Sequence, residues 1–178
     1  MKPQLNLLNE AKILVVGDVI LDRYWIGESK RISPEAPVPV VNGEKILNRL
    51  GGAGNVAANV ASLGCSVSLL GYVGQDEDGD HVRQLLRESQ IESALISREN
   101  LKTTVKIRVI SQGQQLVRVD FEDSPNKFKS DLLTKVFQEL INDYQLVIFS
   151  DYRKGALHDV SRLISLANEK HKRVITDP

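Results

Sequence analysis

Short segments rich in apolar residues alternate with amphipathic segments along most of this chain, and this alternation restricts the possible folds more than any other feature. The segments typical of buried strands are residues 12–18, 65–74, 145–152 and 172–178. Apolar residues at helical spacing predict helices at 49–64, 78–90 (with Asp78 as N-cap), 129–144 and 159–170. We therefore expect an α/β fold with a doubly wound, mostly parallel sheet.

Two regions depart from this alternation. Residues 22–28 and 38–47 are rich in β-forming residues, and the segment "RISPEAPVPVV" that joins them holds three of the six prolines of the chain. Proline fixes φ and removes a backbone donor, so this segment is extended. We expect a small β-lid at approximately 23–47, outside the main sheet. Residues 103–123 hold two alternating runs around Gln112-Gly113-Gln114, which predicts an antiparallel hairpin.

Composition excludes several classes of protein. The length of 178 residues suggests one domain or part of one, with 42% hydrophobic and 26% charged residues as in ordinary globular proteins. The 23 basic and 23 acidic residues balance, so nothing indicates a nucleic acid or an anionic membrane as partner. The single cysteine, Cys65, has no internal disulfide partner, which favours a reducing, cytoplasmic location.

A glycine-rich motif at residues 52–57 permits three interpretations. It matches the dinucleotide fingerprint G-x-G-x-x-G/A, but that fingerprint needs a buried strand directly before it, and the preceding "KILNRL" is interrupted by polar residues. A purely structural alternative is a tight turn that begins an Ala-rich helix. The third interpretation is a polyol site, because glycines admit a ligand to the backbone, a helix N-terminus offers N–H donors, and Asn55 can both donate and accept.

The motif also carries a resemblance to a known family. "GGAGNVAANVASLG" followed by Gly74, and "VVGDVILD" before it, resemble the ribokinase-like (PfkB) carbohydrate kinases. Four co-linear blocks are most similar, within that family, to the D-glycero-β-D-manno-heptose 7-phosphate kinases that form part of bifunctional heptose kinase/adenylyltransferases. These blocks are "GDVILDRYWIGESKRISPEAPVPVV", "LGGAGNVAANVASLG", "QQLVRVDFED" and "SDYRKGAL".

The resemblance implies both an activity and an assembly. The activity is phosphorylation of the heptose 7-phosphate at its anomeric hydroxyl in lipopolysaccharide core synthesis, with ATP and Mg²⁺ as cofactors. The implied fold is a ribokinase-like α/β body with a β-lid over the sugar. In many family members the lids of two subunits pair, so the resemblance implies a homodimer.

Individual residues follow from the same resemblance. Asp22 matches the family aspartate that binds sugar hydroxyls, with Asp18 as a further candidate, and the family's sugar-binding turn matches Gly51, Gly52 and Asn55. A carboxylate can accept charge-assisted hydrogen bonds from two adjacent hydroxyls.

A sugar 7-phosphate also needs a cation. We rank Lys154 first, because ligands of open α/β sheets bind in loops at the carboxyl ends of strands. Arg108 and Arg118 on the expected hairpin follow. The remaining candidates are Arg31, Lys106 and Arg153.

Several motifs of the complete family are not recognised. These are the Gly-Ala-Gly-Asp-like motif with the catalytic base, the acidic NxxE motif that helps to hold Mg²⁺, the late nucleotide-binding strands and an adenylyltransferase H-x-G-H motif. We therefore expect the N-terminal part of a kinase fold, with no recognised catalytic or metal-binding residue, and no activity from this chain alone. We also expect an open edge at 174–176 and an uncovered apolar face at 146–149. The alternatives are a Rossmann-type domain and a non-catalytic module that associates through its lid.

Overall fold

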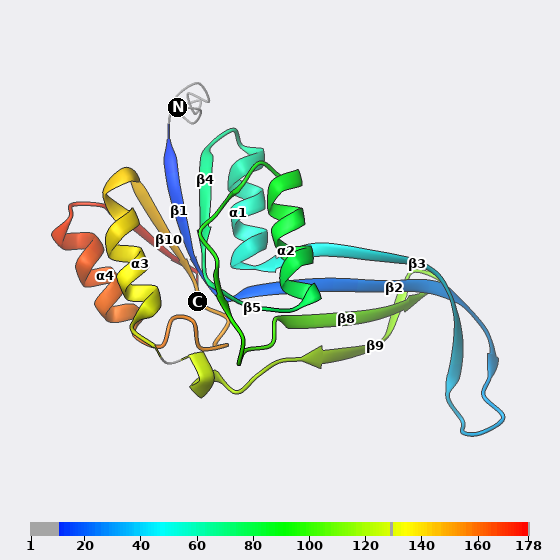
Figure 1. Ribbon diagram of the computed structural model, residues 1–178. Coiled ribbons are helices and arrows are strands. Elements are labelled where there is room, and N and C mark those ends of the chain that lie inside the picture. Colours follow the sequence, from blue (N-terminus) through cyan, green and yellow to red (C-terminus); the bar gives the residue numbers. More distant parts are fainter. Residues whose placement is uncertain (1–10, 129, 178) are drawn as a thin grey trace.

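The computed structural model describes residues 11–128 and 130–177, and its main body is a parallel sheet between two layers of helices (Figure 1). The strand order is β11-β10-β1-β4-β6, and every pairing is parallel. The bounds are β1 Lys12–Gly17, β4 Ser66–Leu70, β6 Glu92–Ser93, β10 Leu146–Ser150 and β11 Arg173–Asp177. This confirms the expected doubly wound, mostly parallel α/β architecture.

Side-chain alternation along β1 divides the core into two halves. Ile13 and Val15 pack toward helices α1 (Ala53–Ser62) and α2 (Glu77–Glu88). Leu14 and Val16 point to the other face, where they join side chains of α3 (Leu132–Leu140) and α4 (Val160–Glu169). Because successive side chains of a strand alternate between the two faces, one apolar strand can support both helical layers.

A second, four-stranded sheet projects from the body (Figure 1), and we call it the lid sheet. Its strands, in the order β3-β2-β8-β9, are β3 Pro39–Gly52, β2 Val19–Ile32, β8 Thr104–Ser111 and β9 Gln114–Phe121. The hairpin expected at 103–123 is present as β8 and β9. It is not a separate unit, because β8 pairs in parallel with β2. The lid strands are also longer than the expected 23–47.

Gly71 divides the strand that we expected at 65–74 into two. Strand β4 ends at Leu70, and Tyr72–Gly74 forms β5, which pairs with β7 (Ile96–Arg98) in a separate sheet. A Cβ atom at Gly71 would lie 2.6 Å from the carbonyl oxygen of Gly17. The chain can therefore lie this close to the end of β1 only with glycine at position 71. The described part is completed by β6 and the short 3₁₀ helices Pro125–Phe128 and Ile141–Asp143.

Two helix starts differ from the sequence-based expectation. Residues 49–52 end strand β3, so α1 begins at Ala53 rather than near residue 49. The N-cap of α2 is Asp76, whose Oδ1 accepts a hydrogen bond from the backbone N–H of Gly79 at 2.8 Å. Asp78 instead pairs with Arg23 of the lid sheet at 2.7 Å. The capping prediction was wrong because Asp76 and Asp78 are both suitable N-cap residues, and the helix begins directly after Asp76.

The expected exposure at 146–149 was largely wrong. Val147, Ile148 and Phe149 are buried, because α3 and α4 cover one face of β10 and α1 covers the other. Strand β11, by contrast, has only β10 as a strand neighbour within the described residues, and Ile175 is 50% exposed. None of the helices in residues 11–128 and 130–177 has the length and apolar character to cross a membrane.

Candidate functional site

A cavity of about 550 Å³ lies between the lid sheet, the glycine turn before α1 and the loop after β10. It brings together most of the substrate-binding residues that the sequence predicted, namely Asp22, Gly51, Gly52, Asn55, Arg108, Arg118 and Lys154. The predicted Asp18 is not among the residues that line it. The cavity also contains side chains for which sequence reasoning had assigned no role, namely Tyr24, Arg49 and Tyr152.

The register of the lid sheet explains how these distant residues meet. Asp22 on β2 lies opposite Arg49 on β3 and Lys106 on β8, and Lys106 lies opposite Asp120 on β9. One row of alternating charge therefore crosses all four strands. Because side chains two positions apart share a face of a strand, the adjacent row on the same face is Leu47, Tyr24, Arg108 and Arg118.

The carboxylate of Asp22 forms an ion pair with Arg108, with 2.5 Å between Oδ1 and the guanidinium nitrogen. Both side chains are largely shielded, with exposed fractions of 18% and 21%. Partial burial disfavours the Arg108 charge, but the hydrogen bond to Asp22 and its negative charge outweigh this and raise the pKa of Arg108. The pair therefore keeps a carboxylate oriented at the cavity wall.

Further ion pairs connect the same wall to β9 and its following loop. Lys106 lies 2.8 Å from Asp120, and Arg118 donates from Nε to the other oxygen of that carboxylate at 2.9 Å. The hydrogen bond from Lys106, followed by that from Arg118, lowers the pKa of Asp120. Lys154 reaches Glu122 at 2.7 Å. Lys154 therefore joins the loop after β10 to the end of β9.

Tyr24 lies between two cations of the cavity. The guanidinium carbons of Arg49 and Arg108 are each 5.4 Å from the centre of the Tyr24 ring. This distance is within the range in which the negative face of an aromatic ring attracts a cation. No motif in the sequence pointed to Tyr24 or Arg49. The only signal was their alternation with Asp22 and Leu47 along the two lid strands.

Asp18 lies behind the cavity and is only 2% exposed. One carboxylate oxygen accepts from the backbone N–H groups of Tyr152 and Lys154, at 2.9 and 3.0 Å, and the other accepts from that of Ala156 at 3.0 Å. Burial raises the pKa of Asp18, although these three hydrogen bonds oppose the shift. Both oxygens are therefore engaged by backbone, and we assign Asp18 to positioning of the loop rather than to a sugar.

Two other cation candidates lie elsewhere. Arg31 is exposed near the end of β2, where it lines a different depression with Glu28 and Lys30. Arg153 is exposed, has a positive φ of 57° and donates from its backbone N–H to Asp151. Neither side chain lines the cavity that contains Asp22.

Glycine is required in the turn before α1, because the backbone there lies close to the backbone of Asp18. Gly52 has a φ of 55°, and a Cβ atom there would lie 2.3 Å from the carbonyl oxygen of Asp18. The turn follows β3, which is antiparallel to β2 and belongs to the lid sheet. A dinucleotide fingerprint instead opens from a strand of a parallel sheet. The Rossmann interpretation of residues 52–57 was therefore wrong, because the turn follows an antiparallel strand of the lid sheet and not a strand of the parallel sheet.

Within the described residues, no group of three or more His, Cys, Asp or Glu side chains is arranged to hold a metal ion. We assign no residue of the cavity to a metal ion.

The fold and the cavity define a class of protein: an α/β domain with a projecting β-sheet and a polar, mainly cationic cavity between the two. Comparison with known families is more specific. The chain belongs to the pfkB family of carbohydrate kinases, whose family model matches residues 10–178. This confirms the resemblance that the glycine motif and the first strand indicated.

Curated relatives and solved structures agree with this assignment. The bifunctional protein HldE of Haemophilus influenzae (strain PittEE) is 46% identical over 170 residues, which are 95% of this chain and 36% of that protein. The HldE of Shewanella amazonensis is also 46% identical, over 178 residues and 37% of its length. The chain thus spans little more than a third of these relatives.

Among solved structures, a carbohydrate kinase from Agrobacterium tumefaciens matches with a TM-score of 0.72 and 20% identity, over 93% of this chain and 53% of that one. The Arabidopsis thaliana ribokinase complexed with ribose and ATP matches with a TM-score of 0.71 and 17% identity, over 94% and 53%. These similarities show a ribokinase-like fold. The chain covers about half of the length of each.

Proposed function

We propose that this chain forms the sugar-phosphate-binding part of a carbohydrate kinase that phosphorylates D-glycero-β-D-manno-heptose 7-phosphate at its anomeric hydroxyl. The proposed pathway is heptose synthesis for the lipopolysaccharide core. ATP supplies the phosphoryl group when it is bound. We assign neither the nucleotide nor Mg²⁺ to residues of this chain, and the residues of the cavity bind and orient the phosphoryl acceptor.

The charge balance of the cavity carries this proposal. Among the residues that the structure describes, five cationic side chains line it, namely Arg49, Lys106, Arg108, Arg118 and Lys154, and the only carboxylate in the lining is that of Asp22. Even with the adjoining Asp120 and Glu122 included, cations exceed carboxylates. The chain as a whole is neutral, so this local excess is not a general property of its surface. A phosphorylated sugar supplies the missing negative charge.

The remaining polar groups of the cavity suit sugar hydroxyls. Asp22 can accept hydrogen bonds, Asn55 can accept and donate, and Gly51 and Gly52 line the cavity beside them. An acceptor with hydroxyls at one end and a phosphate at the other therefore matches the chemistry of this lining. The resemblance of the four sequence blocks to heptose 7-phosphate kinases supports the choice of sugar, and the similarity to a ribokinase complexed with ATP supports the choice of donor.

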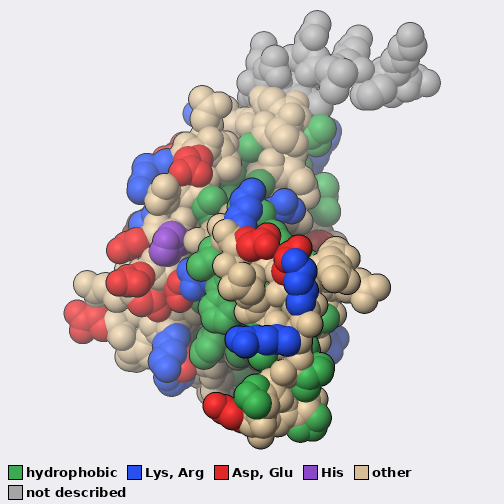
Figure 2. Space-filling view, turned by 90° about the vertical axis from the view of Figure 1, so that its right-hand side faces the viewer, with side chains coloured by type: hydrophobic (Ala, Val, Ile, Leu, Met, Phe, Trp, Pro, Cys, Tyr) green, Lys and Arg blue, Asp and Glu red, His purple; other side chains and the backbone are tan. Residues whose placement is uncertain are grey.

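We also propose that two copies associate through the lid sheet. Its cavity face is charged, whereas the row Ile46, Trp25, Val109 and Val117 on the opposite face is apolar. Ile46, Trp25 and Val117 are 65%, 42% and 50% exposed. Figure 2 faces the end from which the lid sheet projects and shows hydrophobic side chains exposed between charged ones. An exposed apolar sheet face favours association with a partner. The cytoplasm is the proposed location, because ATP is supplied there.

Isothermal titration calorimetry tests the proposed substrate. The chain should bind D-glycero-β-D-manno-heptose 7-phosphate more tightly than the same heptose without phosphate, and it should not bind NAD. A chain that binds neither sugar but forms a stable dimer would support the non-catalytic interaction module instead.

A further inference from the structure

The five cations of the cavity differ in how completely they are neutralised. Lys106 is only 13% exposed and contacts two carboxylates, Asp120 at 2.8 Å and Glu122 at 4.0 Å. Lys154 is 23% exposed and contacts Glu122 at 2.7 Å. The charge of each ammonium is already offset by the adjoining carboxylates, and each ammonium has only three donors, so it attracts a further anion less than an unpaired guanidinium group does. These two lysines therefore maintain the cavity wall.

The arginines are different. Arg118 uses only Nε for Asp120, and its side chain is 50% exposed. Arg108 uses one terminal nitrogen for Asp22. Arg49 is exposed, and among residues 11–128 and 130–177 it has no ion pair; it contacts the Tyr24 ring instead. A guanidinium group has five N–H donors, so all three arginines retain donors for a ligand.

Two of these arginines are direct cross-strand neighbours. Arg108 on β8 lies opposite Arg118 on β9, and both line the cavity. Like charges directly opposite each other on adjacent strands are destabilising. Asp22 and Asp120 lie in the neighbouring row, and their negative charges offset this repulsion. Asp22 contacts only one edge of the Arg108 guanidinium group, and Asp120 only one edge of that of Arg118. A bound dianion between the two guanidinium groups would remove the repulsion.

We propose, on the basis of the function proposed above, that Arg49, Arg108 and Arg118 form the phosphate subsite of the cavity, while Lys106 and Lys154 keep their carboxylate partners. Planar guanidinium groups bind phosphate oxygens in a bidentate manner, which a lysine cannot do. The Tyr24 ring contacts the guanidinium groups of Arg49 and Arg108 and so positions them within the subsite. Asp22, Asn55 and the glycine turn then bind the hydroxyl end of the same ligand.

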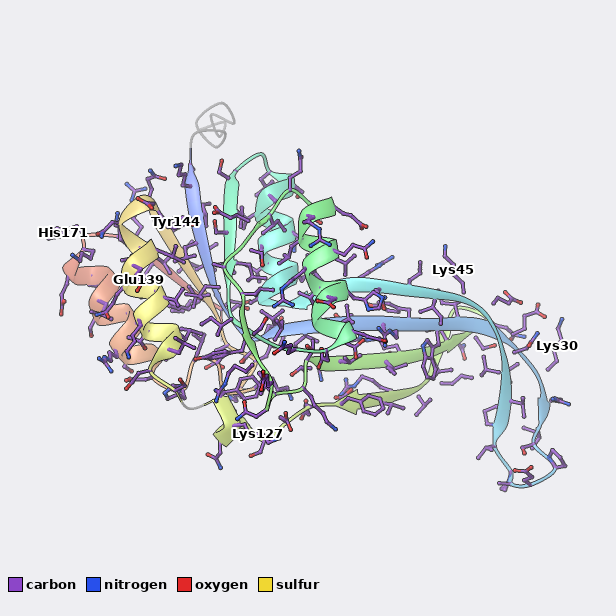
Figure 3. The ribbon with its side chains drawn as sticks, viewed as in Figure 1. Lys30, Lys45, Lys127, Glu139, Tyr144 and His171 are labelled. Carbon is purple, nitrogen blue, oxygen red and sulfur yellow. The ribbon has the colours of Figure 1, made fainter. Side chains whose placement is uncertain are left out.

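This assignment has a structural consequence. All three arginines belong to the lid sheet, on β3, β8 and β9, whereas Asn55 belongs to α1 of the body. The phosphate is therefore recognised by the lid sheet and the hydroxyls partly by the body, so a sugar phosphate bridges the two. Lys30 and Lys45 lie farther out along the projecting sheet (Figure 3), and neither lines the cavity.

The test measures phosphate selectivity, defined as the ratio of the affinities for heptose 7-phosphate and for the unphosphorylated heptose. Calorimetry is carried out on the wild-type chain and on Arg49→Gln, Arg118→Gln and Lys154→Gln. Lys135→Gln, on the exposed surface of α3 and outside the cavity, is the matched control for removal of one charge. Each arginine variant should lower the selectivity by roughly tenfold or more, and the effect of Lys154→Gln should be several-fold smaller.

The possible outcomes separate this inference from the proposed function. If heptose 7-phosphate binds to both arginine variants as tightly as to wild type, or if Lys154→Gln alone abolishes selectivity, the phosphate subsite is wrong and the proposed substrate stands. If another sugar phosphate such as fructose 6-phosphate binds with the same dependence on arginine and the heptose does not, the subsite stands and the proposed substrate is wrong. Absence of binding by any sugar phosphate overturns both.

Discussion

The carboxylate of Asp18 accepts a hydrogen bond from the backbone N–H of Ala156 at 3.0 Å, although 138 positions separate the two residues. Its other oxygen accepts from Tyr152 and Lys154. One side chain at the end of β1 thus organises the loop after β10. That loop carries Tyr152 and Lys154 into the cavity, so the geometry of the site depends on a residue that does not line it.

Replacement of Asp18 by Asn tests this positioning role. An amide has only one acceptor oxygen, so its NH₂ group would face at least one of the three backbone donors. We expect a loss of about 1–3 kcal/mol in the free energy of unfolding and faster proteolysis within 151–156. Urea unfolding and limited proteolysis measure the two effects. Unchanged stability together with lost sugar binding would instead return Asp18 to the ligand site.

Asp22→Ala should weaken binding of heptose 7-phosphate by roughly tenfold or more. The reason is the loss of a charge-assisted hydrogen bond, which contributes about 1.5–3 kcal/mol. Calorimetry measures the affinity, and Asp80→Ala on the exposed side of α2, where the aspartate side chain is 82% exposed, is the control. Equal affinities in wild type and Asp22→Ala would remove Asp22 from the site.

Gly51→Ala should impair binding with little loss of stability. A Cβ atom at Gly51 would lie 2.4 Å from Oδ2 of Asp22, and the end of that flexible side chain can move away. The displaced carboxylate would then leave its position at the cavity wall, so we expect a fall in affinity comparable to that of Asp22→Ala. Gly43→Ala on the same strand is the matched control, because nothing lies within 4 Å of its added Cβ. Calorimetry measures the affinity and thermal unfolding measures the stability, so the two measurements together separate a loss of binding from a loss of stability.

Asp76→Asn should destabilise the chain in a pH-dependent manner. Burial alone would raise the pKa of Asp76, but hydrogen bonds from Thr103 and Gly79 outweigh it, and the pKa lies below its ordinary value of 3.8. A lowered pKa means that Asp76 contributes stability above pH 3.8, and that this contribution disappears as the pH falls through the lowered pKa.

We expect a loss of about 1–2 kcal/mol at pH 7 from the weakened cap and from a backbone donor of Thr103 left facing the amide. Urea unfolding over a pH series should show that wild type and variant differ less in free energy of unfolding at acidic pH than at pH 7. A difference that is constant with pH would contradict the role of the charge. Asp80→Asn is the exposed control on the same helix.

Lysine substitutions on the apolar face of the lid sheet should disrupt the proposed dimer. Ile46 is 65% exposed on edge strand β3, and Val38 is 52% exposed in the connection at the end of the lid. A lysine at either position places a charge in an apolar interface, so sedimentation should show a shift from dimer to monomer. Leu63→Lys, at the end of α1 and 58% exposed, should leave the dimer intact. A wild-type chain that is monomeric at high concentration would rule out the interface.

The layered body of this protein and its family could both be predicted from the amino-acid sequence alone. Apolar runs followed by helical periodicity identify the strands and helices, because each such element must bury one face against the next. The glycine turn and Asp22 were also recognisable, since their residue types and spacing form a motif within a short stretch. The same reasoning failed at the N-cap of α2, because Asp76 and Asp78 are equally suitable residue types for that position.

The assembly of the cavity could not be predicted from the sequence, because it depends on contacts between distant parts of the chain. Strand β8 pairs in parallel with β2, although 84 positions separate the partners Asp22 and Lys106, and no local pattern specifies the pairing of such distant strands. That pairing places Arg108 beside Asp22 and Tyr24, and the antiparallel return of β9 adds Arg118. Arg49 and Tyr24 have no motif of their own. They belong to the site because sheet register, which depends on long-range backbone hydrogen bonds, aligns them with the charged rows.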